Sequence, residues 1–119
     1  MTWRTEQVND VIRAELAELL REEVNDPRVK GLVTVTRVDV SPDLRQARAH
    51  ISVLGTDEDR LSTMRALESA RPFLRREVGK RVKLRHTPDL HFVSDTTMEE
   101  AQELTDQMRR NAEERGETL

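Results

Sequence analysis

The chain has 119 residues, of which 36% are Asp, Glu, Lys or Arg and 35% are hydrophobic. This length suits one domain with one core. The absence of cysteine excludes disulfides, thiolate metal sites, iron–sulfur clusters and cysteine nucleophiles. No apolar run approaches the ~18–20 residues of a membrane span, and the charged residues 1–7 lack the apolar stretch of a signal peptide. We therefore expect a soluble, cytoplasmic protein that does not bind membranes.

The charges are unevenly distributed along the chain, although the net charge is only −3. Residues 60–86 hold nine basic and two acidic side chains, a net charge of +7, whereas residues 87–119 hold three basic and nine acidic ones, a net charge of −6. Because local potential governs the choice of partner more than total charge does, the basic segment predicts a surface for nucleic-acid phosphates. The alternative is an ordinary solvated helix face, which usually mixes both signs.

The first part of the chain predicts a helix followed by a β-hairpin. Residues 5–24 carry one apolar stripe at helical spacing, and Asn25-Asp26-Pro27 ends the helix because the residue before proline is pushed out of helical geometry. The stripe comprises Val8, Val11, Ile12, Leu16, Leu19, Leu20 and Val24. Gly31 opens a β-branched strand over residues 32–40, and a change in its alternation predicts a bulge near Thr36 and Arg37.

A second strand follows the turn at residues 41–43, and the short connection favours an antiparallel hairpin. Its alternation places Ala47, Ala49, Ile51 and Val53 on one face and Arg48, His50 and Ser52 on the other. After Gly55, Thr56 or Asp57 is expected to cap the next helix.

Pro72 interrupts this next helix, because proline removes a hydrogen bond and its ring clashes with the preceding turn. The pattern therefore predicts two helices, or one kinked helix, that meet at Ala70, Arg71 and Pro72 and end near Val82. A third strand is expected over residues 90–94.

The last helix is predicted to begin at a capping box formed by Thr97 and Glu100. Its apolar side consists of Met98, Ala101, Leu104, Met108 and Ala112. Residues 113–119 are predicted to be a disordered acidic tail, which leaves a single domain over residues 1–112. The element order predicts an α+β domain in which helices cover one face of a three-stranded sheet.

The helix after Pro72 presents a row of cations. At about 100° per residue, Leu74, Val78 and Val82 define its buried side. Arg76, Lys80 and Lys83 then lie on the opposite side, and Arg75 and Arg81 flank the apolar stripe. A break at residues 70–72 would also expose the backbone N–H groups of a helix N-terminus, which bind phosphate.

No catalytic constellation is evident in the sequence. His86 and His91 lie five residues apart across a proline turn, and His50 lies on an earlier strand. We interpret them as surface or hairpin histidines, because neither cysteine nor an organised set of carboxylates completes a metal site. We therefore expect no enzyme activity, no metal and no cofactor.

Five segments, in the same order, resemble the ribosome-binding factor A family, and together they span roughly residues 3–110. They are residues 26–28 (DPR), 38–45 (VDVSPDLR), 52–55 (SVLG), 73–81 (FLRREVGKR) and 87–92 (TPDLHF). The resemblance implies a KH-like domain of type II, α-β-β-α-β, in which an interhelical kink, commonly Ala-x-Gly, replaces the Gly-x-x-Gly loop. Here the kink maps to Ala70-Arg71-Pro72, where proline replaces glycine and removes one backbone N–H.

The resemblance also implies a function, which is not enzymatic. Members of the family bind the free small (30S) ribosomal subunit late in its assembly, assist maturation and processing of its 16S rRNA, and support growth in the cold. We expect the small subunit and its 16S rRNA as partners, and a monomer. The residues predicted to contact RNA are Arg75, Arg76, Lys80, Arg81 and Lys83, then Arg71 and Arg85, with Arg45 and Arg48 as a weaker second patch. The alternative is a protein–protein adaptor whose basic helix binds an acidic partner.

Overall fold

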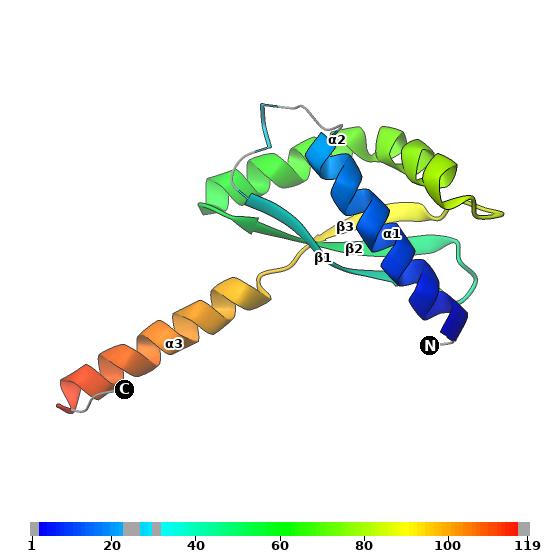
Figure 1. Ribbon diagram of the computed structural model, residues 1–119. Coiled ribbons are helices and arrows are strands. Elements are labelled where there is room, and N and C mark those ends of the chain that lie inside the picture. Colours follow the sequence, from blue (N-terminus) through cyan, green and yellow to red (C-terminus); the bar gives the residue numbers. More distant parts are fainter. Residues whose placement is uncertain (1–2, 23–26, 30–31, 117–119) are drawn as a thin grey trace.

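The computed structural model describes residues 3–22, 27–29 and 32–116. The elements are, in order, α1 (Trp3–Glu22), β1 (Leu32–Val40), β2 (Gln46–Leu54), α2 (Asp57–Val82), β3 (Asp89–Ser94) and α3 (Thr97–Glu114) (Figure 1). The predicted helix end at Asn25 and Asp26 and the predicted strand start at Gly31 lie outside the described residues. None of the described helices has the length and apolarity required to cross a membrane.

The sheet is mixed, with the strand order β1-β2-β3. β1 and β2 form the predicted antiparallel hairpin, and β3 runs parallel to β2. A parallel pair needs a long crossover connection, which α2 supplies. The predicted bulge is confirmed: Val35 pairs with Ile51 and Arg37 pairs with His50, so Thr36 is the extra residue.

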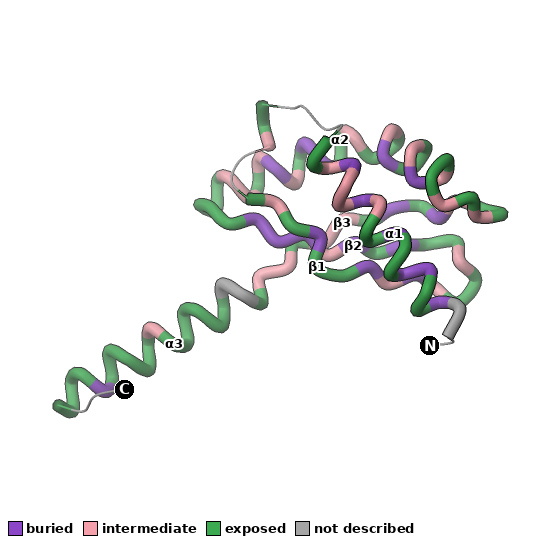
Figure 2. Tube along the Cα trace, in the orientation of Figure 1, coloured by how far each residue is buried: buried purple, intermediate pink, exposed green. Residues whose placement is uncertain are grey.

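α1 and α2 cover one face of the sheet, and the core lies between these two layers (Figures 1 and 2). The β2 residues predicted to face the core are all buried, as alternation along a strand requires. The buried Asn9 side chain fixes α1 to the end of β1, because its Oδ1 accepts a hydrogen bond from the Val40 backbone N–H at 2.8 Å. Val11, which the apolar stripe included, is 45% exposed, so the buried side of α1 is narrower than predicted.

α2 is one continuous helix that passes through Pro72 (Figure 1). It begins with a capping box in which the Thr56 side chain accepts from the Asp59 N–H and the Asp59 carboxylate accepts from the Thr56 N–H. The chain therefore has one helix here and not two. Because the helix is not interrupted at residues 70–72, the helix N-terminus expected there as a phosphate site is not formed, and that prediction is wrong.

α3 extends away from the sheet (Figure 1), and nearly all of its described side chains are exposed, Ala112 being the buried exception (Figure 2). Leu104 and Met108 are 58% and 53% exposed, so the prediction that this helix joins the others on the sheet is wrong. The predicted capping box is also absent: Thr96 precedes the helix without a side-chain cap, and the Asp95 carboxylate accepts from the Thr97 N–H at 3.0 Å. α3 continues to Glu114, two residues into the segment predicted as a tail, and residues 117–119 lie outside the described residues.

Asp95 links the end of β3 to the bulge in β1. The Thr36 hydroxyl donates to Asp95 Oδ2 at 2.6 Å. This bond, followed by those from Thr97, lowers the pKa of Asp95 from 3.8 to about 2. A carboxylate whose pKa is lower in the folded than in the unfolded state stabilises the fold at pH values above its unfolded-state pKa. This contribution is lost as the pH falls through its folded-state pKa.

We therefore expect Asp95→Asn to remove a contribution of up to about 1 kcal/mol, which solvent screening keeps small. In urea denaturation, the wild type should lose this extra free energy of unfolding between pH 3.8 and about 2, and the variant should not. An identical pH profile for the two proteins would contradict the assignment.

Candidate nucleic-acid interface

The cations of α2 lie on its outer side, as the helical spacing predicts. Leu74 and Val78 are completely buried, whereas Arg76 and Lys80 are exposed. Lys83 follows the helix as its C-cap, in the left-handed conformation with φ 55°. The helix therefore presents Arg76 and Lys80 to solvent, and Lys83 extends this row beyond the helix end.

Several of the predicted RNA-contacting residues already have partners within the protein. Lys80 Nζ lies 3.4 Å from the Glu77 carboxylate, and the partners of Arg71 and Arg81 are Glu68 and Glu15, each at 3.6 Å. Exposed pairs of this kind are weak and open readily, so these side chains remain available to a ligand.

Arg75 is held more firmly than the other cations. Its guanidinium lies 3.0 Å from Asp89 Oδ1 and donates to the Thr87 carbonyl oxygen at 2.9 Å. It therefore connects α2 to the segment that leads into β3, in addition to any contact with RNA.

The other predicted RNA-contacting cations form no ion pair in the part of the chain that the structure describes. They are Arg45, Arg48, Arg76, Lys83 and Arg85. Because no ion pair within that part of the chain engages their side chains, these cations are the strongest candidates for binding phosphate.

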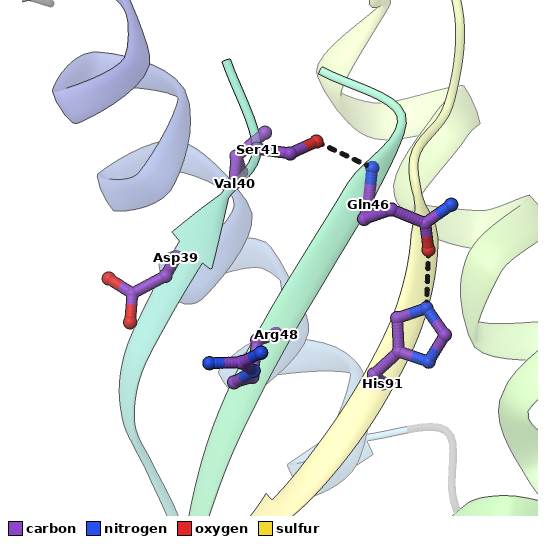
Figure 3. A pocket seen from close by; sticks show the side chains of 6 residues that line it. All are labelled: Asp39, Val40, Ser41, Gln46, Arg48 and His91. Carbon is purple, nitrogen blue, oxygen red and sulfur yellow. Dashed lines mark hydrogen bonds between the residues drawn. The ribbon is translucent and has the colours of Figure 1, made fainter. Parts of the chain in front are cut away.

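Three adjoining hollows bring residues from α2, the hairpin and β3 together. The sheet pocket, about 560 Å³, is lined by Asp39, Val40, Ser41, Gln46, Arg48 and His91 (Figure 3). The helix pocket, about 510 Å³, is lined by Arg71, Pro72, Arg75, Arg76, Asp89, Leu90 and His91. The hairpin pocket, about 390 Å³, is lined by Arg45, Gln46, Arg75, His86, Thr87 and Asp89.

The hollows share residues and so form one continuous surface. His91 lines the sheet and helix pockets, Gln46 the sheet and hairpin pockets, and Arg75 the helix and hairpin pockets. The two patches that the sequence suggested are therefore neighbours. The remaining predicted cations, on the last turns of α2 and just beyond it, line none of these three hollows; they are Lys80, Arg81, Lys83 and Arg85.

The sequence analysis did not assign Gln46, His86 and His91 to the site. The available signal was the alternation of β3, which places His91 on the face opposite Leu90 and Phe92. Alternation does not show which strand β3 pairs with, and it is the parallel register with β2 that sets His91 beside Arg48.

The hairpin turn holds Arg45 and Gln46 in place. The Ser41 hydroxyl donates to Asp43 Oδ1 at 2.6 Å and accepts from the Gln46 N–H at 3.0 Å, while the Arg45 N–H donates to Asp43 Oδ1 at 3.1 Å. The bond from Ser41, and then that from the Arg45 N–H, lowers the pKa of Asp43. Leu44 adopts a φ of 61° to close the turn.

The segment between α2 and β3 packs directly on a glycine of α2. A Cβ at Gly79 would clash with the Thr87 Oγ1 and lie 3.4 Å from both the Cβ and the Cγ2 of Thr87. The Asp89 N–H donates to the Arg45 carbonyl at 2.9 Å, so this segment also supports the hairpin turn. Because Gly79 has no side chain, the segment that carries Thr87 can pack closely on α2 and line the hairpin pocket.

We expect Gly79→Ala to lower the free energy of unfolding by about 1–3 kcal/mol, because the new methyl group overpacks the contact with Thr87. Thr87→Ala removes the obstructing atoms. In the double variant, alanine should then stabilise the helix relative to glycine by up to about 1 kcal/mol. A double-mutant cycle measured by urea denaturation checks this coupling; strictly additive effects would contradict it.

His50 and His91 bond to different partners. His50 Nε2 lies 3.3 Å from Asp39 Oδ2 and 3.2 Å from the Arg37 guanidinium, whereas His91 bonds to Gln46. Within the described ranges, no group of three His, Asp or Glu side chains converges as a metal-binding cluster.

A mixed three-stranded sheet covered on one face by α1 and α2, with the α-β-β-α-β order and a cationic surface along α2, defines a KH-like α+β domain. The chain belongs to the ribosome-binding factor A family. The sequence profile described as "Ribosome-binding factor A" matches residues 4–108.

Individual relatives agree with this assignment. A ribosome-binding factor A of Clostridium novyi is 41% identical over 104 residues, which are 87% of this chain and 86% of that protein. The crystal structure of ribosome-binding factor A from Thermus thermophilus superposes with a TM-score of 0.66 at 27% identity, covering 76% of this chain and 94% of that one.

A further similar structure is a homology model of the Thermus thermophilus protein fitted into the cryo-EM map of a complex between the 30S subunit and ribosome-binding factor A. Its TM-score is 0.60 at 29% identity, and the match covers 72% of this chain and 89% of that one.

Proposed function

We propose that this protein binds the free small ribosomal subunit through its 16S rRNA and assists late maturation and processing of that RNA, including during growth in the cold. It acts as a cytoplasmic, monomeric, non-catalytic factor. The observation that carries the proposal is the continuous surface of the three hollows and the outer side of α2. It gathers arginines and lysines from separate parts of the chain, several of which form no ion pair among the described residues.

The charges and the comparisons support this proposal together. Cations without internal partners release counterions when they neutralise phosphates, which gives affinity for an RNA backbone. The similar protein of Thermus thermophilus has been fitted into the cryo-EM map of a complex with the 30S subunit. A rigid surface that spans α2, the hairpin and β3 suits a folded RNA, which proteins recognise largely by shape and backbone.

Sucrose-gradient co-sedimentation tests the proposal. The purified protein is run with free small subunits and, separately, with intact ribosomes, over ~50 to 200 mM salt, where binding through phosphate contacts changes most. We expect comigration with free small subunits that is lost at high salt. Failure of the folded protein to comigrate at any salt concentration would overturn the proposal.

Ribonuclease treatment separates this function from that of an adaptor for an acidic protein. An RNA-mediated complex is lost when its RNA is digested, whereas a complex with an isolated acidic protein survives. The same gradients, compared between precursor and mature subunits, test the timing: preferential binding to precursors supports a role in late maturation.

A further inference from the structure

The face of the sheet opposite α1 and α2 carries polar side chains around the sheet pocket. In Figure 3 this face is seen with both helices behind the strands. Gln46 and Arg48 come from β2, His91 from β3 and Asp39 from β1, so all three strands contribute to the lining. The hollow of about 560 Å³ lies within the ~300–1,000 Å³ typical of small-ligand sites.

Gln46 bonds to His91 through its side-chain oxygen, which leaves its NH₂ group without a partner among the described residues. The Gln46 Oε1 accepts from the His91 Nε2–H across the parallel pair β2–β3 (Figure 3). The Gln46 NH₂ group keeps its two donors for a ligand.

Arg48 adds a cation that no side chain neutralises within the described part of the chain. Its cross-strand neighbour Asp39 is engaged elsewhere, 3.0 Å from the Arg37 Nε and 3.3 Å from the His50 Nε2. Guanidinium and imidazole planes are both surfaces on which unpaired RNA bases stack. The exposed Arg48 and His91 side chains flank the same hollow.

We propose that the sheet pocket binds one unpaired nucleotide of single-stranded RNA. The base lies between Arg48 and His91, and acceptors on its edge are bonded by the Gln46 NH₂ group. Arg45, in the hairpin pocket that shares Gln46, reaches the adjoining phosphate. This proposal deepens the proposed function and rests on it, because it names the form of RNA that one part of the surface recognises.

The lining favours a base over an acidic peptide. A base edge carries ring-nitrogen or carbonyl acceptors that the Gln46 NH₂ group can bond, and its flat ring can stack between Arg48 and His91. The carboxylate side chains of an acidic peptide offer no ring to stack between these two residues. A duplex keeps its base edges paired and stacked, so it would not present a base to this hollow.

Fluorescence anisotropy with two labelled RNAs tests the proposal on the full chain. One probe is an unstructured RNA of about ten nucleotides, and the other is a fully paired RNA duplex of equal charge. Gln46→Ala and His91→Ala should each weaken binding of the single strand about tenfold, and change duplex binding less than about twofold. Because glutamine carries no charge, Gln46→Ala should leave the salt dependence of single-strand binding unchanged.

Two controls make the result specific. Gln102→Ala removes the same amide from α3, where it bonds to Asp106, and should change neither affinity. Arg76→Ala should weaken the binding of both RNAs. The slope of log K against log salt should become shallower by about one, as expected for one lost phosphate contact. Equal losses for both RNAs in Gln46→Ala, or unchanged single-strand affinity, would overturn the pocket assignment.

Co-sedimentation of the same variants separates the two proposals. If the wild type binds small subunits while Gln46→Ala binds single-stranded RNA normally, the nucleotide pocket is wrong and the proposed function stands. If the wild type binds neither subunits nor RNA, the proposed function is wrong, and the pocket proposal fails with it.

Discussion

Replacing both Arg76 and Lys80 by glutamate is expected to weaken binding to free small subunits by about tenfold or more at moderate salt. Both side chains lie on the outer side of α2, and neither packs in the core. Reversal exchanges two phosphate-attracting cations for two repelling anions. The dependence of log K on log salt should therefore become shallower by about two, one for each lost phosphate contact. Quantitative co-sedimentation over a salt series measures both values.

A double variant with the same charge change on α3 is the matched control. Arg109→Glu with Arg110→Glu alters the net charge equally, but on the helix that extends away from the sheet (Figure 1). We expect this control to retain most of its affinity. If both double variants lose affinity equally, binding depends on total charge and not on the surface along α2. Circular dichroism should show the wild-type helix content in each protein.

Leu74→Ala should lower the free energy of unfolding by about 2–5 kcal/mol, because it removes buried methyl groups and leaves a cavity. Leu74 is completely buried against the sheet. The same substitution at Leu104, on the apolar side of α3, should cost less than about 0.5 kcal/mol, since this side chain is 58% exposed and outside the core. Urea denaturation of both variants, with a common m-value, measures the difference.

The comparison of the two leucines tests whether α3 contributes to folding. Each leucine lies on an apolar stripe, and each variant is the same leucine-to-alanine change in a helix. A loss of several kcal/mol for Leu104→Ala would show that α3 packs on the domain in solution, contrary to the structure. Comparable small losses for both variants would contradict the assignment of Leu74 to the core.

Local patterns predicted the elements of this protein well. The phase change in the first strand predicted the bulge at Thr36, and the apolar spacing of Leu74, Val78 and Val82 predicted the buried side of α2. Both succeed because strand and helix periodicities depend on neighbouring residues only. The outward position of Arg76 and Lys80 follows from the same spacing.

Predictions that needed distant parts of the chain were less successful. Pro72 was expected to give either two helices or one kinked helix, and local pattern did not decide between them; the structure has one helix, α2, that continues through that residue. The cap of α3 was assigned to Thr97, whereas the carboxylate that bonds its N–H comes from Asp95, which Thr36 of the bulge holds in place. These outcomes depend on contacts between residues far apart in the sequence.

In the candidate site, too, the sequence predicted local features but not contacts between distant residues. The concentration of cations over residues 60–86 is a property of the sequence alone, and it points to phosphate. The sequence does not show which of these cations are already paired within the protein: Arg75 was predicted to contact RNA, yet it also bonds to Thr87 and Asp89. The pairing of Gln46 with His91 depends on a parallel register that no local pattern specifies.

The sequence by itself determined the type and order of the elements, the inward faces of α1, β2 and α2, and the cationic character of the segment after β2. These follow from periodicity, turn chemistry and charge, which act over a few residues. Only the tertiary structure decided that β3 lies parallel to β2, that α3 leaves the domain, and that three hollows join the hairpin to α2. The physical reason is that an apolar or charged stripe shows which side of an element is suited to burial or to solvent, whereas its partner is selected by the packing of the whole domain.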